Sequence, residues 1–307
     1  AGNLVANDTN RLNDVFRRDL QTGVTELVSA NAAGTGSGNR TSFDPVLSDN
    51  GLFIAFGSQA TDFVSTTDTN NSTDVFYRDM VSRTTSLASK SRTGSSTGDG
   101  PSGNPFLSRD GRFLVFITLA SNIISGDANG KQDVVLLNIA SGSMELISAD
   151  QSGTGTGNGY SGATADSLSE DGNFIAFFST ASNLVSNDTN NQSDVFVRDR
   201  AAGRTILMSR PIDGTGIGSA GSFAPAISLN GQFVVFASDG TNLVNGDTNA
   251  MTDVFGVKTG TNASTTLPAD LALSITVDPA NPGVGTNVIV SVTLTNPSPR
   301  SVITITV

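Results

Sequence analysis

The chain has 307 residues, no cysteine, no histidine and a formal net charge of −11. Without cysteine there can be no disulfides or thiolate metal sites, and without histidine the commonest general base and transition-metal ligand is missing. The acidic balance argues against a nucleic-acid partner, because phosphate binding needs a concentrated Lys/Arg surface. A metal could be bound only through oxygen, and oxygen-only sites favour hard cations such as calcium.

The chain opens part-way through a repeating unit. Residues 1–5 align with residues 181–185, which lie downstream of two expected strands in their own unit. We therefore expect the first unit to lack its first two strands. Upstream residues, the C-terminal region or another chain are the alternatives for supplying them, because an open blade exposes unpaired backbone groups.

The first complete unit begins with two apolar runs, 42–48 and 52–56, separated by an Asp-Asn-Gly turn. Asn-Gly or Asp-Gly between apolar runs is a strong hairpin signal, since the tight turn needs positive φ. We predict two strands joined by a two-residue turn. A long loop, a third strand and a fourth strand follow, most clearly at 194–198 and 205–209 of a later unit. Four short antiparallel strands are typical of one β-propeller blade.

One stretch recurs five times and sets the period of the chain. It reads Asp-x-Asn-x-x-x-Asp-Val, and the steps between successive copies are 60, 59, 61 and 59 residues. A fixed period of this kind indicates a repeat architecture. The fold class is therefore predicted to be all-β. We expect a five-bladed β-propeller over residues 1–266, with repeats of about 60 residues, four antiparallel strands per blade and an incomplete first blade.

Phenylalanines at matching places predict how neighbouring blades pack, because large rings fill the space between stacked, twisted sheets. Three of the third strands end in an Arg-Asp pair, and we expect the Asp to open a turn and the Arg to cover the blade surface. These pairs are Arg18-Asp19, Arg78-Asp79 and Arg198-Asp199. The matching phenylalanines of the second strands are Phe53 and Phe56, Phe113 and Phe116, Phe174 and Phe177, and Phe233 and Phe236.

The five loops act as internal replicates of a candidate calcium site. Positions one and seven are always Asp and position three is always Asn, whereas position five varies, as expected if it offers only its backbone carbonyl. Calcium accepts six to eight oxygens of this mixed kind. The alternative is an Asx-turn network without metal. Because close, unpaired carboxylates repel, we favour about one calcium ion per loop, which would bring the net charge from −11 to about −1. The predicted ligands are Asp8, Asn10, Asp14, Asp68, Asn70, Asp74, Asp127, Asn129, Asp133, Asp188, Asn190, Asp194, Asp247, Asn249 and Asp253.

The chain changes character at about residue 267. Three runs in the last 40 or so residues alternate apolar and polar side chains, and Pro and Gly separate them. They match the start of an immunoglobulin-like (Ig-like) sandwich, which normally needs about seven strands. We therefore expect residues 267–307 to form a partial Ig-like sandwich, or a tail that exchanges strands with a neighbouring subunit.

The string from Ser169 to Asp199, Ser-x-Asp-Gly-x-Phe-x-x-Phe followed by the loop and Asp-Val-Phe-x-Arg-Asp, resembles the TolB-like, WD-type propeller repeats of secreted bacterial and archaeal proteins. The Ala-Asp-Leu start and Pro-Gly-Val-Gly turn of the tail are similar to repeat modules of large bacterial surface proteins. The resemblance implies an extracellular or cell-surface scaffold. It also implies a protein partner, since the family includes a periplasmic protein-binding propeller.

No aperiodic cluster of acid, base and nucleophile is visible in the sequence, so we predict that the chain is not an enzyme. Paired carboxylates could do glycosidase chemistry, but those of this chain are periodic. The leading hypothesis is a calcium-stabilised extracellular structural or adhesive subunit. It would assemble into a surface layer or fibre through strand sharing at its termini, by self-association or with other surface proteins. The alternative is a protein- or glycan-binding propeller module of the cell surface or periplasm. No apolar run reaches the ~20 residues of a membrane span.

Overall fold

The computed structural model describes residues 4–211, 213–214, 216–249 and 251–259, together with three strands nearer the C-terminus. Every regular element in this part of the chain is a β-strand. No helix long and apolar enough to cross a membrane occurs among the residues described. The prediction of an all-β fold is confirmed.

The strands form five successive antiparallel sheets, in which spatial order follows chain order. We number them as first to fifth blade, and only the second, third and fourth have four strands. The first blade holds β1 (Phe16–Arg18) and β2 (Thr25–Leu27). The second holds β3 (Ser42–Leu47), β4 (Phe53–Ser58), β5 (Asp74–Asp79) and β6 (Thr84–Leu87). The third holds β7 (Ser102–Leu107), β8 (Phe113–Thr118), β9 (Asp133–Asn138) and β10 (Met144–Leu146). The fourth holds β11 (Ser161–Gly162), β12 (Phe174–Ser179), β13 (Asp194–Asp199) and β14 (Arg204–Leu207), and the fifth holds β15 (Ser222–Ile227), β16 (Phe233–Ser238) and β17 (Asp253–Lys258).

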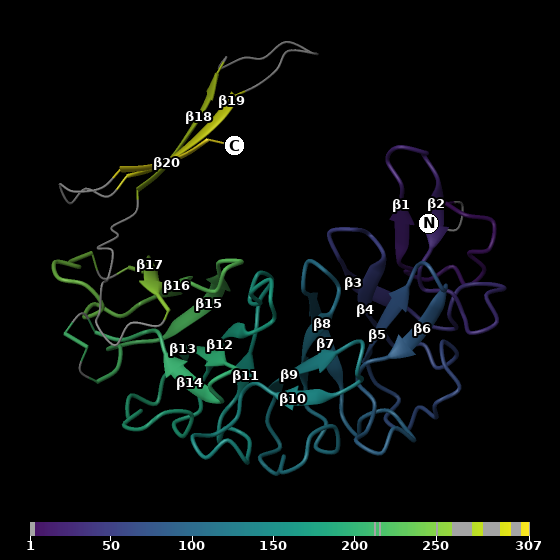
Figure 1. Cartoon of the computed structure of the whole chain (residues 1–307), viewed down its shortest axis with the longest axis horizontal. Coiled ribbons are helices and arrows are strands. Elements are labelled where there is room, and N and C mark those ends of the chain that lie inside the picture. Colours follow the sequence, from purple (N-terminus) through teal and green to yellow (C-terminus); the bar gives the residue numbers. More distant parts are fainter. Residues whose placement is uncertain are drawn as a thin grey trace.

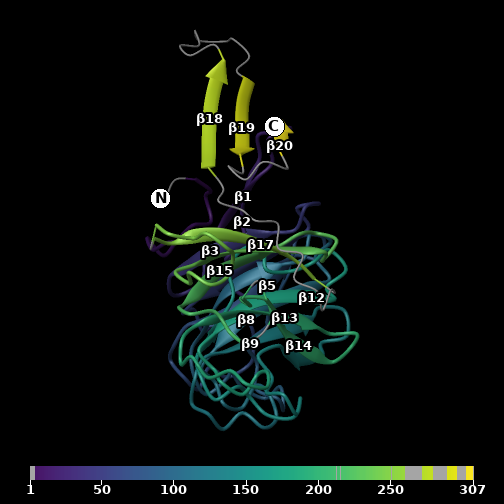
Figure 2. The ribbon, with the colours of Figure 1, turned by 90° about the vertical axis from the view of Figure 1, so that its left-hand side faces the viewer.

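The predicted set of five propeller blades with an incomplete first blade is thus confirmed. The blades follow one another along an arc, with the first and fifth at opposite ends (Figure 1). Strands β3 and β15 lie toward the inside of the arc, and β6 and β14 lie toward the outside. Seen from the end that carries the fifth blade, the sheets lie one behind another (Figure 2).

The tail contributes a separate three-stranded antiparallel sheet, in the order β18 (Ala272–Asp278), β19 (Ile289–Thr295) and β20 (Val302–Thr306). The three strands expected there are present. The predicted boundary between the propeller and the tail falls within residues 260–271, outside the described residues.

Phenylalanines fill the space between neighbouring blades, as the sequence predicts. Phe177 on β12 is fully buried, and its ring stacks on Phe196 of β13 with 5.5 Å between ring centroids. The same stacked pair recurs as Phe56 with Phe76 in the second blade, at 6.0 Å. Paired rings bury much apolar area and add roughly 0.5–1.5 kcal/mol beyond that burial.

The turn between the first two strands differs from the prediction of a two-residue loop. Gly51 alone has positive φ, at 68°, and its N–H donates to the Ser48 carbonyl at 2.8 Å. The Ser48 hydroxyl accepts the Phe53 N–H at 3.0 Å and donates to Asn50 Oδ1 at 2.7 Å. This side-chain clamp spans the turn, and five residues, 48–52, lie between β3 and β4, so the two-residue prediction is wrong. The clamp recurs in the third, fourth and fifth blades, starting from Ser108, Ser169 and Ser228.

The turn glycine also meets the preceding blade. A Cβ placed on Gly172 would lie 2.3 Å from the Phe113 ring, and one on Gly231 would lie 2.4 Å from the Phe174 ring. Only glycine allows both the left-handed conformation and this approach. Gly51 has the same conformation but nothing within 4 Å, because the described part of the first blade lacks a counterpart of β4, the strand that presents the ring in the second blade.

The first strands carry a repeated bulge that the sequence did not lead us to expect. Asp44, Asn104 and Ala224 have φ between 47° and 51°, and each precedes a proline where the strand register shifts. The fourth blade departs from this pattern, since β11 has only two residues and a longer loop with Asp166 at φ 64° follows it.

The Arg-Asp pairs are only partly as predicted. Asp79 opens a turn, because its Oδ1 accepts the N–H of Val81 at 2.8 Å. The arginines differ: Arg18 is exposed, but Arg78 and Arg198 are only 8% and 7% exposed. The prediction that they cover the blade surface is wrong for these two, because each is buried where its blade packs against the preceding one.

Candidate metal centres

In the second to fifth blades, the Asp-x-Asn-x-x-x-Asp loop connects the second strand of the blade to the third. Its position-seven aspartate is the first residue of the third strand in four blades, at Asp74, Asp133, Asp194 and Asp253. The loop therefore delivers this carboxylate at a fixed place on a regular element. The structure places all fifteen predicted ligand residues in these five loops, within the part of the chain that it describes.

The position-three asparagine fastens the loop on two sides. Asn70 Oδ1 accepts the N–H of Ser72 at 2.7 Å, which closes an Asx turn. Asn70 Nδ2 donates to the Gly98 carbonyl at 2.8 Å, 28 residues along the chain. The same amide-to-glycine bond recurs in the first, third and fourth loops, at Gly38, Gly157 and Gly218. The Asx turn is thus real, and the asparagine ties the loop to the crossing that leads to the next blade.

The position-seven aspartate is held by a serine that the sequence analysis missed. Ser89 Oγ donates to Asp74 Oδ1 at 2.8 Å and accepts the Val75 N–H at 3.0 Å. The serine lies 15 residues after the aspartate in each of the first four loops, at Ser29, Ser89, Ser148 and Ser209. The constant separations of 15 residues for the serine and 28 for the glycine were signals that could have found both partners.

Burial makes the charged form of these aspartates costly. Asp74, Asp133 and Asp194 are 2%, 1% and 0% exposed. Desolvation raises the pKa of Asp74 and Asp133 to about 7 and that of Asp194 to about 6, although the serine and asparagine hydrogen bonds act in the opposite direction.

The two carboxylates of one loop lie close enough to repel each other. The charge of Asp68 contributes to raising the pKa of Asp74, and that of Asp188 acts likewise on Asp194. Burial also raises the pKa of the position-one carboxyls of Asp127 and Asp188. The fold therefore brings carboxylate pairs together, with the position-seven aspartate buried in the second, third and fourth loops and half-buried in the first and fifth.

Several carboxylate oxygens in these loops are buried without a hydrogen-bond partner. They are both oxygens of Asp8, Oδ2 of Asp14 and Oδ1 of Asp247. An unpartnered buried oxygen costs free energy that a bound cation would remove. No group of three or more acidic side chains suited to a metal is found among the residues described. A cation would therefore need the asparagine and backbone oxygens as well, and an all-oxygen donor set of this kind fits calcium.

Neither a family model nor a curated protein matches this sequence. The structure is similar to a TolB candidate from Agrobacterium tumefaciens, with 17% identity, a TM-score of 0.42, and coverage of 94% of this chain and 72% of that one. It is also similar to oligogalacturonate lyase from Vibrio parahaemolyticus, with 11% identity, a TM-score of 0.49, and coverage of 96% and 73%. A prolyl endopeptidase matches with 11% identity and a TM-score of 0.49, and this chain spans 36% of its length.

Proposed function

We propose that this chain is a calcium-stabilised β-propeller that serves as a structural or adhesive subunit outside the cell. The proposal is carried by the repeated pair of aspartates in each loop, and above all by the buried, unpartnered oxygens of Asp8 and Asp14 in the first loop. Asp8 and Asp14, with Asn10 and nearby backbone carbonyls, would hold one ion, and the equivalent residues would hold one in each other loop. Calcium would neutralise two like charges and join the second and third strands of the blade.

The expected affinity supports a location outside the cell. Two carboxylates per loop is a low charge count, and calcium sites of extracellular modules bind at roughly 10⁻⁴–10⁻³ M. At ~100 times its Kd, calcium would stabilise the fold by ~2.7 kcal/mol per independent site. Several such sites would make folding depend on the calcium of the surroundings.

A non-catalytic role agrees with the chemistry of the acidic residues. The carboxylates with strongly raised pKa values, those of Asp74, Asp133 and Asp194, belong to the repeating loops. Each is already bound by a serine and an asparagine. A general acid or base would need one such group to stand apart from the repeat and face a substrate.

Calcium titration of the chelator-treated protein tests the metal sites. We expect isothermal titration calorimetry to give about five ions per chain, and the melting temperature to rise with millimolar calcium but much less with magnesium. The variant Asp133→Asn should bind one ion fewer. A melting temperature that chelator leaves unchanged, together with no heat of binding, would contradict the metal sites.

Sedimentation velocity separates the structural subunit from a binding module. We expect the full chain to self-associate in calcium and to dissociate when EGTA is added. A chain that stays monomeric in both buffers but retains a glycan or protein ligand would favour the binding-module alternative instead.

A further inference from the structure

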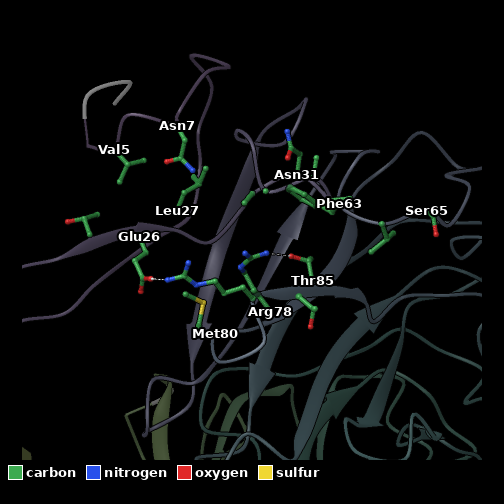
Figure 3. A pocket seen from close by; sticks show the side chains of 18 residues that line it. Val5, Asn7, Glu26, Leu27, Asn31, Phe63, Ser65, Arg78, Met80 and Thr85 are labelled. Carbon is green, nitrogen blue, oxygen red and sulfur yellow. Dashed lines mark hydrogen bonds and ion pairs between the residues drawn. The ribbon is translucent and has the colours of Figure 1, made fainter.

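A cavity of about 810 Å³ opens at the outer side of the junction between the first and second blades. Leu27 of β2 and Phe63 and Met80 of the second blade give it apolar walls (Figure 3). Arg78 of β5 projects among these side chains toward Thr85 of β6. We call this space the first groove.

The guanidinium of Arg78 is buried in the first groove and only partly satisfied. The residue is 8% exposed, and its Nη1 donates to Thr85 Oγ1 at 2.8 Å. Its Nε is buried and has no hydrogen-bond partner. Arginine stays charged in proteins and presents its donors as a rigid fork. A buried cation that lines a cavity and has an unsatisfied donor is the arrangement expected of an oxyanion site.

No acidic side chain in the described residues forms an ion pair with Arg78. Glu26, on the same wall, pairs with Arg17 and with Arg83, the latter at 3.4 Å. Arg78, Arg83 and Glu26 are the charged side chains that line the groove, and the charge of Glu26 also acts on Arg78. The first groove is locally positive, which favours an anionic ligand.

Two other blade junctions of the same chain show what is particular to the first groove. Between the second and third blades, Leu137 and Met144 take the places of Arg78 and Thr85, and the cavity there is about 350 Å³. Between the third and fourth blades, Arg198 replaces Arg78 and its Nε is also unpartnered.

The junction between the third and fourth blades differs from the first groove at one position next to the buried arginine. Arg200 stands where Met80 stands in the first groove, and it binds Glu145, the equivalent of Glu26, at 2.7 Å. Met80 cannot make this bond. The first groove thus combines a buried guanidinium with a cavity of about 810 Å³ and a Met80 that leaves Glu26 free of this bond.

We propose that the first groove binds the carboxylate of an extended ligand with an apolar flank, as presented by the C-terminus of a peptide with an apolar last residue. Arg78 receives the carboxylate, because its fork matches two carboxylate oxygens. The half-buried Val5 and Val64, backed by the buried Leu27, Phe63 and Met80, hold the apolar side chain that precedes it. The apolar walls favour such a ligand over free phosphate, which would lose water there without gaining contacts.

The test is calorimetric titration of the full chain in calcium with the tripeptide acetyl-Ala-Leu-Phe as free acid and as amide. We expect the acid to bind and the amide to bind about tenfold more weakly or not at all. Arg78→Leu, which copies Leu137, should abolish binding. Arg198→Leu removes the equivalent buried arginine and should leave binding unchanged, which controls for lost stability.

Met80→Arg provides a second variant in case Arg78→Leu fails to fold. It copies Arg200, fills the cavity and places a cation beside Glu26, so we expect it to fold and to lose the peptide acid. Equal binding of acid and amide, no binding of either, or loss of binding in Arg198→Leu would overturn the proposal. Inorganic phosphate competing as strongly as the peptide acid would overturn its carboxylate specificity.

Discussion

The middle of the arc and its two ends are built from the same sequence motif but bury it differently. Phe113 in the third blade is 8% exposed, whereas its equivalent Phe233 in the fifth is 41% exposed. Asp133 is 1% exposed, but Asp253 is only partly buried. The burial of a repeated residue is thus set by the neighbouring blade. We expect the calcium affinity of each candidate site to depend on that neighbour as well.

The loops also differ in the partners that hold them. The first four have a serine 15 residues after the position-seven aspartate and a glycine 28 residues after the asparagine. In the fifth loop those positions are Pro268 and Val277, which lack the serine hydroxyl and do not repeat the glycine. The fifth loop keeps the bonds of Asn249 to Met251 and Asp253, at 2.8 and 3.4 Å. We therefore expect it to depend more on its cation than the middle loops do, since those are also held by the serine and the glycine.

The largest expected effect is on the stability of the metal-free protein, which should depend on pH because of the buried aspartates in the middle blades. Burial raises the pKa of Asp74 and Asp133 to about 7 and of Asp194 to about 6, above the unfolded value of 3.8. The folded state therefore binds more protons than the unfolded state between about pH 4 and pH 7. Stability from these groups is fully present below pH 3.8 and is lost as pH rises through 6 and 7.

Urea denaturation in EGTA should accordingly show the free energy of unfolding falling by a few kcal/mol from pH 5 to pH 8. Calcium should remove or reverse this fall, because it binds the ionised carboxylates and protons compete with it. The aspartates whose pKa is lowered, such as Asp79 and Asp110, stay ionised across this range and do not obscure it. A metal-free protein that gains stability toward pH 8 would contradict the buried pairs.

The next largest effect is the loss of stability when a turn glycine is replaced by alanine, and it should differ between the middle of the arc and a position next to its end. Gly172→Ala should destabilise by about 3 kcal/mol, since its φ of 71° already disfavours alanine and the new Cβ would meet Phe113 at 2.3 Å. Gly51→Ala should cost only about 1 kcal/mol, because its φ is 68° but nothing lies within 4 Å. The measurement is the urea midpoint in saturating calcium. Equal losses would show that contact with the preceding blade is not what requires glycine.

The fold could be predicted from the sequence because each blade is built from local hairpins and the chain repeats them. Matching positions such as Phe56, Phe116 and Phe177 confirm one another within a single sequence. The turn type could not be predicted, since it depends on the Ser48 hydroxyl bridging five residues. The bulges before Pro45 and Pro105 likewise depend on pairing register, which local propensity does not fix.

The candidate metal centres could likewise be predicted from the sequence only in part. The carboxylate pairs were visible as a motif, but their burial was not, because it is supplied by crossings and sheets tens of residues away. Arg78 and Arg198 were expected at the surface for the same reason. Their burial depends on the preceding blade, where Glu26 and Glu145 lie more than 50 residues earlier in the chain.

The smallest expected effect distinguishes the free-energy cost of burying the charge of Asp133 from the stabilisation that a calcium ion bound to it would add. In EGTA at pH 8, Asp133→Asn should stabilise the protein by about 1 kcal/mol, because it removes a desolvated charge. An asparagine oxygen can still accept the Ser148 hydroxyl, which donates to Asp133 Oδ1 at 2.7 Å. The gain is small because the new amide group would face the Asn129 amide, now 3.2 Å from Oδ2.

In calcium the sign of this effect should invert, since Asp133→Asn removes a ligand and with it up to ~2.7 kcal/mol of linked stability. Asp253→Asn is the matched control at the end of the arc. Its partly exposed carboxylate pays little desolvation, so we expect a change of less than about 0.5 kcal/mol in EGTA and a loss only in calcium. If Asp133→Asn is less stable than the original protein in both buffers, the carboxylate stabilises the loop through its hydrogen bonds to serine and asparagine, and the loop needs no ion.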